Sequence, residues 1–288
     1  MADTFLTRKQ HVVSSLVEAL DPNRRDKSPK GFVDAPILDL IHIINEHPDY
    51  YTTSSCSGRI AIYCEGLEKA ESEDTLEKTT KGGTWLYVTH DPVDIPTMNR
   101  EQRDQWVLKL LFGDQIDRVS LATERPENIL QKQLVYFKFE PLILHVEASH
   151  QHTAMRLLGL AFQAGYQNSG ITPSRSRQML AIRSTHKLDT PIAYVDPITH
   201  RIVCLVDPDY LYLLVTMSNQ KFMQNMDRMK LFLDMMKKEV ESANIMQHVE
   251  TKEERRERKR REGMAKQQAL QAQTSNEVSA MDTTDTSS

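Results

Sequence analysis

The sequence predicts a protein that mixes helices and strands and lacks the nucleotide-binding sheet of a Rossmann fold. Along the 288 residues, segments with apolar residues at helical spacing alternate with segments of strand-like period two. The chain has only ten glycines, and none forms a GxGxxG or GxxxxGK[ST] turn for nucleotide phosphates. There is also a hint of internal repetition, because a Ser/Gly pattern followed by an apolar strand occurs at 54–64 and again at 169–183.

Five segments have the apolar spacing of helices. They are 5–20, a segment that starts near Asp34 and ends before Pro48, 99–112, a segment around 157–162 that stops at Gly165, and a long segment from Pro208. Asp34 is expected to cap the second helix, with Pro36 in its first turn. Asn99 and Gln102 have the spacing of a capping box for the third helix, and Gly113 is expected to end it.

Alternation of apolar and polar residues predicts the strands. They are 50–52, 60–64, 84–90, 134–140, 142–147, 168–171 and 178–185. Pro141 is expected to break the strand pattern between Glu140 and Leu142, because proline cannot donate to a sheet ladder. The polar residues between the first two strands are expected to form a turn.

That polar segment, Thr53 to Ile60, is the most informative feature of the chain. It combines small hydroxyl side chains and a thiol with Gly58 and Arg59. An arginine fork with hydroxyls and backbone N–H groups suits a carboxylate or a phosphate. The alternative is a polar hairpin in which Arg59 pairs with a surface acid, and the segment by itself favours neither.

Composition and charge exclude several classes of protein. The chain is 39% hydrophobic and 26% charged, which is typical of a soluble globular protein, and no apolar run approaches the length of a membrane span. No secretory signal is visible, and three cysteines without a CxxC framework indicate reduced thiols in a cytosolic or nuclear protein. The net charge of −4 does not indicate a nucleic-acid binder, so any such partner must use a local patch.

Two basic segments are candidates for such a patch. Between Gly170 and Lys187 there are four Lys and Arg residues and no acid, although small charge clusters are usually solvated loop rims. Residues 252–262 carry a net charge of +3 and are interpreted as a solvated helix end, with a nuclear-localisation or RNA-contacting segment as the alternative. Residues 250–288 are expected to be a charged and then Ser/Thr-rich, largely disordered tail after a single domain at 1–249.

Metal binding and nucleophilic catalysis would use the same cysteine and histidine residues. Cys56, Cys64, His90 and His145 offer zinc-type ligands, but their spacing matches no usual zinc motif, so no metal is predicted. A Cys–His pair of Cys56 with His90 or His145 is conceivable, with a structural thiol as the alternative.

Several separated motifs together resemble one family. They are Asp26–Gly31 with Asp34, Tyr51–Ile60, Trp85–His90, Phe137–Val146, Asn168–Ile171 and Met179–His186. In this order, from about Phe5 to about Met236, they resemble the wybutosine-synthesis methyltransferases, the tRNA wybutosine-synthesising protein 3 family. An acidic insertion at 66–81 and the tail after Val249 depart from the family pattern without touching a motif.

The resemblance implies a non-Rossmann α+β fold, in which strands from two related β/α halves form one barrel-like mixed sheet with flanking helices. It also implies S-adenosylmethionine-dependent methylation of N4 of a tricyclic guanosine-derived base, the 4-demethylwyosine-type intermediate beside the anticodon of phenylalanine tRNA. The expected partners are that anticodon loop and other wybutosine-pathway enzymes. No membrane association is expected, and the expected location is the cytoplasm. A non-catalytic tRNA-binding adaptor of the same fold is the alternative.

On this basis we expect a donor site in the first half of the chain. Arg59, Ser54 and Ser55 are expected to hold the donor carboxylate, with Cys56 in the same segment and Gly58 allowing close approach. Trp85 is expected to stack on adenine or on the modified base, or to be a core residue.

The proton and the RNA need further groups. His90 and His145 are the candidate bases, because imidazole titrates near pH ~6.5, and Glu140 could orient one of them. The residues expected to contact the tRNA are Arg175, Arg177, Arg183, Ser184 and Lys187.

Overall fold

The computed structural model describes residues 4–19, 34–66, 82–124, 126–172 and 176–248, together with 256, 259–261 and 264. The chain divides into two units, 1–240 and 241–288. All strands lie in the first unit; the second contains the end of the last long helix and a few helical positions. The predictions for the tail after 264, for most of 252–262 and for the 66–81 insertion fall on residues outside this description.

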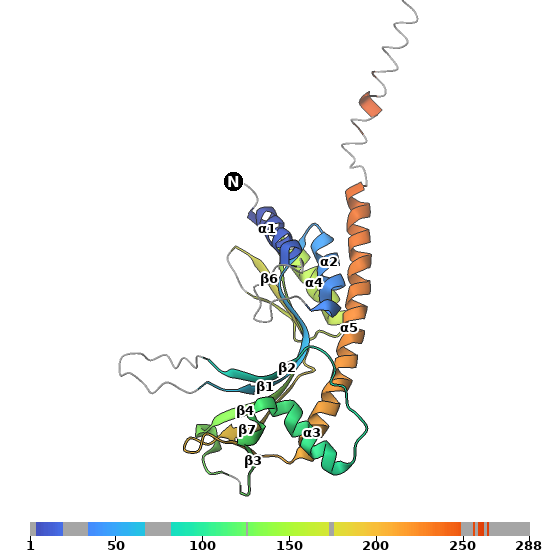
Figure 1. The fold of residues 1–288 in the computed structure, drawn as a ribbon. Coiled ribbons are helices and arrows are strands. Elements are labelled where there is room, and N and C mark those ends of the chain that lie inside the picture. The colour runs from blue at the N-terminus through green and yellow to red at the C-terminus, as the bar shows by residue number, and fades with distance from the viewer. Residues whose placement is uncertain are drawn as a thin grey trace, which may run out of the picture. The chain divides into compact units, whose positions relative to one another are not determined.

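The elements follow one another in a mixed order (Figure 1). The helices are α1 (Thr4–Ala19), η1 (Ala35–Ile37), α2 (Leu38–Glu46), α3 (Arg100–Phe112), η2 (Gly113–Arg118), η3 (Ile129–Gln131), α4 (Gln151–Gln163) and α5 (Pro208–His248). The strands are β1 (Tyr50–Cys64), β2 (Thr84–Thr89), β3 (Val119–Leu121), β4 (Gln133–Ala148), β5 (Gly170–Thr172), β6 (Gln178–Arg183), β7 (Leu188–Val195) and β8 (Ile202–Cys204). No helix in the described ranges has the length and apolar character to cross a membrane.

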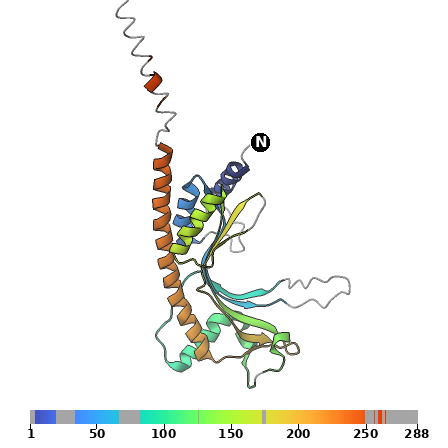
Figure 2. The same ribbon diagram turned by 180° about the vertical axis from the view of Figure 1, so that it is seen from behind.

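The strands form one mixed sheet of eight, in the order β2-β1-β4-β7-β8-β3, with β6 also paired to β4 and β5 paired to β6. Among the strands that the structure describes, only β3 and β8 pair in parallel. The sheet is strongly curved, and the part of α5 that belongs to the first unit runs along one side of it (Figures 1 and 2). A curled, mostly antiparallel sheet with flanking helices confirms the predicted non-Rossmann α+β class.

Local signals predicted several elements correctly. The capping box of Asn99 and Gln102 is present at the start of α3, and Gly113 follows its end. Ile37, Ile41 and Ile44 are buried in the second helical segment. None of the predicted strands corresponds to β3, β7 or β8, of which β3 and β8 have only three residues each.

Two predictions in the centre of the sheet were wrong. Residues 53–60 do not form a turn, because β1 continues through them as one strand of 15 residues. Pro141 does not end a strand either, since β4 runs through it for 16 residues. Gly58 and Pro141 lie opposite each other in the register of these two long strands.

At this pair the alternation of buried side chains changes phase. In β4, Phe137 and Phe139 are buried on one side of the break, while Leu142 and Leu144 are buried beyond it. Ser57 and Gly58 are likewise buried in succession in β1. Gly58 has φ +129°, a conformation that residues with a side chain rarely adopt. A prediction based on strict period two therefore ends the strand at this position, although the chain continues as a strand.

The phase change produces two hydrophobic clusters that one helix covers. The first cluster joins α2, α4 and β6 to Met229 and Phe232 of α5. The second joins α3, β7 and β8 to Leu211 and Phe222 of α5. Because both clusters face α5, the opposite side of β1 and β4 carries the polar residues that the sequence singled out.

Candidate functional site

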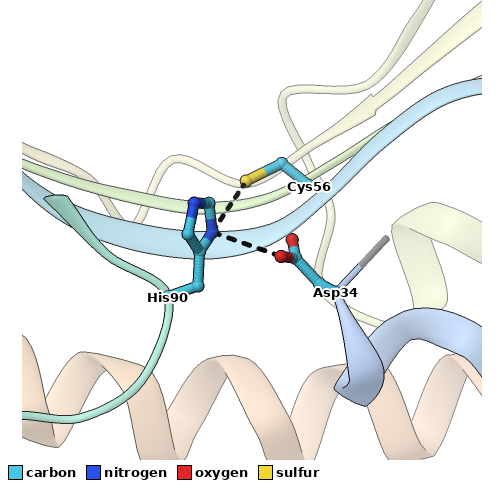
Figure 3. Close-up of side chains that lie close together, drawn as sticks. All are labelled: Asp34, Cys56 and His90. Atoms are coloured by element: carbon cyan, nitrogen blue, oxygen red, sulfur yellow. Dashed lines mark hydrogen bonds and ion pairs between the residues drawn. The ribbon is translucent and has the colours of Figure 1, made fainter. Parts of the chain in front are cut away.

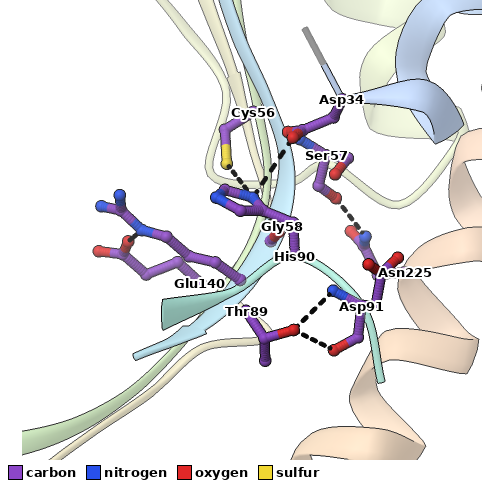
Figure 4. Close-up of polar contacts among 10 residues, drawn as sticks. Asp34, Cys56, Ser57, Gly58, Thr89, His90, Asp91, Glu140 and Asn225 are labelled. Carbon is purple, nitrogen blue, oxygen red and sulfur yellow. Dashed lines mark hydrogen bonds and ion pairs between the residues drawn. The ribbon is translucent and has the colours of Figure 1, made fainter. Parts of the chain in front are cut away.

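The backbone at the phase change is held by two side chains from other elements (Figure 4). The N–H of Ser57 donates to Oδ2 of Asp34 at 2.8 Å, and its carbonyl accepts from Nδ2 of Asn225 at 2.7 Å. Oδ1 of Asn225 also accepts from the N–H of Leu142 at 2.9 Å. Asp34 and Asn225 are 4% exposed each, so these bonds satisfy backbone groups that water cannot reach.

Asp34 therefore has a role that the sequence did not predict. It precedes η1, but its side chain makes no capping hydrogen bond there, so the predicted cap was wrong. The carboxylate instead reaches across to β1 and lies 3.5 Å from Nδ1 of His90. The motif around it signalled a family resemblance but not this contact, which joins residues 56 positions apart in the chain.

His90 lies just after β2, and its Nδ1 faces Asp34 and Cys56 (Figure 3) as well as the carbonyl of Gly58. Nδ1 is 3.0 Å from the Gly58 carbonyl, 3.5 Å from Asp34 and 3.7 Å from Sγ of Cys56. A carbonyl only accepts, so Nδ1 carries a hydrogen and the lone pair of the neutral ring is on Nε2. The buried carboxylate of Asp34 stabilises the charged imidazolium that forms when Nε2 takes a proton.

The second candidate base, His145, lies near the C-terminal end of β4. Its Nδ1 is 2.8 Å from Oγ of Ser54, the neighbouring residue on β1. Burial lowers the pKa of His145, and the positive charge of Arg183 lowers it further. The imidazole is therefore neutral at pH 7, and it orients the Ser54 hydroxyl. Ser55 points to the other side of β1, by strand alternation, so the structure separates the two serines.

Arg59, which follows Gly58 in β1, lies next to Trp85 of the neighbouring strand β2. Nε of Arg59 pairs with Glu140, and its guanidinium lies 4.4 Å from the centre of the Trp85 ring. Glu140 lies on the same side of β1 as Cys56, and Asn225 lies on the opposite side (Figure 4). Trp85 is 42% exposed and is not a core residue. Glu140 pairs with Arg59 here, so the expectation that it orients a histidine was wrong.

Gly58 permits a close approach, but by atoms of the same chain. A Cβ at this position would lie 3.1 Å from the Glu140 carbonyl and 3.2 Å from Nδ2 of Asn225. These contacts replace the donor approach that we expected from the sequence. The carbonyl of Gly58 contributes to the site as the acceptor for His90.

The residues expected to contact tRNA are in different environments. Arg183 and Lys187 are exposed. Ser184 is buried and its hydroxyl accepts from Arg228 at 2.8 Å, which ties it to α5. Arg177 pairs with Glu147, a carboxylate that is 1% exposed and also bound by Arg8 and Tyr51. Arg175 lies outside the described residues.

Metal ligands come together in part. The ligand atoms of Asp34, Cys56 and His90 lie within 4.8 Å of one another and could hold an ion. The four-residue zinc-type set is not assembled, because Cys64 is buried in the second hydrophobic cluster and His145 bonds Ser54. A cavity of about 400 Å³ lined by Pro126, Ile129 and Leu205 among others contains none of the predicted site residues.

Comparison with known proteins decides the family. A family model described as Methyltransferase TYW3 matches residues 7–238. The chain belongs to the TYW3 methyltransferase family. It is 35% identical to tRNA wybutosine-synthesizing protein 3 of Saccharomyces cerevisiae over 269 residues, 90% of this chain and 94% of that one. It is 30% identical to the tRNA wybutosine-synthesizing protein 3 homolog of Bos taurus, over 80% of this chain and 75% of that one.

Other matches extend this result. A tRNA wybutosine-synthesizing protein 2/3/4 of Arabidopsis thaliana is 39% identical over 78% of this chain, which spans 20% of that longer protein. Among solved structures, the PH1069 protein from Pyrococcus horikoshii superposes with a TM-score of 0.53 at 24% identity, covering 81% of this chain and 95% of that one, which supports the fold.

The family resemblance seen in the motifs is thus confirmed. The TYW3 family consists of methyltransferases of the wybutosine pathway, so this member is a tRNA methyltransferase rather than an adaptor. A methyltransferase family implies a methyl donor of the S-adenosylmethionine type, and the pathway implies a tRNA substrate.

Proposed function

We propose that this TYW3 family member transfers a methyl group from S-adenosylmethionine to N4 of the tricyclic guanosine-derived base beside the anticodon of phenylalanine tRNA. The observation that carries the proposal is the environment of His90. In its neutral form, an imidazole whose Nδ1 is fixed by a backbone carbonyl and that has a buried carboxylate beside it is suited to accept a proton.

The residues on this side of β1 fit the amino-acid end of the donor. That end is a zwitterion, and Arg59 and Glu140 present a cation and an anion side by side. The ion pair uses Nε of Arg59, which leaves the edge formed by its two terminal nitrogens for a second carboxylate. Ser54, oriented by His145, and Cys56 lie on the same strand. When bound, S-adenosylmethionine supplies an electrophilic methyl carbon for an in-line displacement.

His90 is the proposed base. Nε2 takes the proton from N4 of the target base as the new N–C bond forms, and the resulting positive charge is stabilised by Asp34. Nδ1 keeps its hydrogen bond to the Gly58 carbonyl throughout, so the ring does not turn. His145 positions Ser54 and does not move a proton in this scheme.

The RNA contacts and the partners are part of the same proposal. Arg183 and Lys187 are exposed and meet phosphates of the tRNA backbone, and Arg175 is proposed to join them. Arg177 is held by its pair with Glu147, and Ser184 ties the chain just after β6 to α5. The name of the 2/3/4 relative supports contact with enzymes of other steps in the pathway. The cytoplasm remains the predicted location.

Single-turnover methyl transfer to tRNA that lacks only this methyl group tests the proposal. His90→Gln should lower the rate by about 100-fold or more, because general-base catalysis contributes at least this much, while tRNA affinity stays within about twofold. His145→Gln is the matched control and should lower the rate by about tenfold or less. The opposite order would make His145 the base. Absence of transfer by the parent protein would contradict the methylation itself and favour the adaptor.

A further inference from the structure

Three aromatic side chains form one row across adjacent strands of the sheet. Tyr63 of β1 lies opposite Trp85 of β2 and also opposite Tyr136 of β4 in the strand register. The rings of Tyr63 and Trp85 are 4.7 Å apart between centres, at an angle of 50°. We call Trp85, Tyr63 and Tyr136 the aromatic row.

The aromatic row lies on the side of the sheet that carries the candidate site. Its neighbours in sequence, Ile62, Val135 and Phe137, are buried in the second hydrophobic cluster and point the other way. Arg59 lies on the same side as Tyr63 by alternation and covers Trp85 at 4.4 Å. The row is therefore continuous with the proposed donor site through Arg59.

Sheet stability explains only part of the row. Cross-strand aromatic pairs stabilise sheets, and the Tyr63 ring covers Gly83, where a Cβ would lie 2.0 Å from the Tyr63 hydroxyl. This accounts for Tyr63. It does not account for Trp85, which is 42% exposed, nor for Tyr136, which is only half-buried.

The two cations beside the row, Lys138 and Arg59, are paired. Lys138 lies 5.1 Å from the centre of the Tyr136 ring and 5.9 Å from that of Tyr63, and its ammonium pairs with Asp189 at 2.8 Å. Arg59 pairs with Glu140 in the same way. A surface with exposed rings and neutralised cations suits the faces of bases better than phosphate groups.

We propose that the aromatic row is a stacking platform for unpaired nucleobases of the RNA loop that flank the target base. This inference rests on the proposed function, since it concerns the nucleotides beside the methylated one. Neighbouring strands are about 4.8 Å apart, so three rings span about 10 Å, enough for two or three bases. The row holds the loop open by stacking, while Arg183 and Lys187, which are exposed, contact the phosphates.

The fluorescence of Trp85 tests the contact directly. The chain has two tryptophans, and Trp106→Phe leaves Trp85 as the only reporter. Titration with an unmodified anticodon stem-loop of phenylalanine tRNA, without methyl donor, should quench this fluorescence in a saturable manner. RNA that binds, as measured by filter retention, without any quenching would overturn the proposal.

Variants of Tyr136 give an independent test with the native tryptophans. Tyr136→Leu should weaken stem-loop affinity by about tenfold, while Tyr136→Phe, which keeps the ring, should retain it. The slope of log affinity against log salt should be the same in all three proteins, because stacking releases no counterions. Tyr210→Leu, which removes a more exposed tyrosine from the start of α5, is the control and should have no effect.

These results separate the inference from the proposed function. Unchanged affinity in Tyr136→Leu, or a changed salt slope, would overturn the stacking platform even if the parent protein methylates tRNA. If the parent fails to methylate but the stem-loop still quenches Trp85, the platform holds and the methylation proposal fails.

Discussion

The two halves of the sheet bury opposite phases of the same two strands. Near α2 and α4, β4 buries Leu142, Leu144 and Val146, whereas near α3 it buries Val135, Phe137 and Phe139. A flat strand with strict alternation would put these two sets on opposite sides. The change of phase at Gly58 and Pro141 lets both sets face α5, so one helix completes both clusters.

The same change leaves different chemistry on the other side of each half. Toward α1 that side carries Ser54 with His145, and further on Glu147 with its arginines. Toward the β1–β2 hairpin it carries the aromatic row. The groups around His90 lie at the boundary, where backbone bonds given up by the sheet are made by Asp34 and Asn225. The site thus lies where the burial phase of β1 and β4 changes, next to the Gly58–Pro141 pair.

Loss of the bridge from α5 should have the largest effect on stability. Asn225→Leu leaves the buried Ser57 carbonyl and Leu142 N–H without partners, which should lower the free energy of unfolding by about 4 kcal/mol, from two unsatisfied groups. Asn219→Leu is the matched control: Asn219 binds both backbone groups of Val93 in the same way but is only partly buried, and about 1 kcal/mol is expected. Urea unfolding measures both, and equal losses would show that the boundary is no different from an ordinary loop contact.

A side chain at Gly58 should have the next largest effect. Gly58→Ala forces a residue with a Cβ to φ +129° and to 3.1 Å from the Glu140 carbonyl, at a cost of about 3 kcal/mol. Gly113→Ala separates the two causes, since Gly113 also has positive φ, +49°, but no atom within 4 Å of a new Cβ, and about 1 kcal/mol is expected. If both variants lose the same stability, crowding at the phase change contributes nothing.

Loss of the Glu147 carboxylate should have the smallest effect on stability of the three changes, and the effect should be confined to the half of the sheet near α1. Burial acts to raise the pKa of Glu147, but hydrogen bonds from Arg177, Arg8 and Tyr51 together outweigh it and hold the pKa below its usual value. Glu147→Gln should cost about 2 kcal/mol at pH 7, less than for a fully buried pair because both arginines are partly exposed.

The pH dependence of this variant has a definite sign. With a lowered pKa in the folded protein, the contribution of Glu147 is complete above the pKa of the unfolded chain and is lost as the pH falls through the folded pKa. The difference between parent and Glu147→Gln should therefore be constant from neutral pH down to about 5 and vanish at lower pH. In Glu147→Gln, the amide hydrogens of β7 and β8 should exchange as slowly as in the parent protein. Faster exchange there would mean that the two halves are not independent.

Sequence reasoning succeeded where the physical cause was local. The capping box of α3 depends on Asn99 and Gln102 alone, and the length of α5 follows from apolar residues at helical spacing. It failed for Thr53–Ile60 and Pro141 because each position was judged within its own strand. β4 continues through Pro141, and the N–H of the next residue, Leu142, donates to Asn225 of α5 instead of to a strand.

The candidate site shows the same division. Residue types indicated Arg59, Trp85, Cys56 and His90 as the groups that bear the chemistry, and the structure brings these four together. Residue types did not indicate a role in the site for Asp34 and Asn225, because their shared partner, the backbone of Ser57, lies 23 and 168 positions away from them.

The amino-acid sequence by itself determined the types of most elements, the family and the set of reactive side chains, because these depend on local spacing and on motifs. Tertiary structure alone decided which phase of β1 and β4 is buried, which acid faces His90 and which aromatic residues share a row. Those outcomes depend on strand register and on the packing of α5 across both clusters. Such contacts join distant segments, and no periodicity within one segment encodes them.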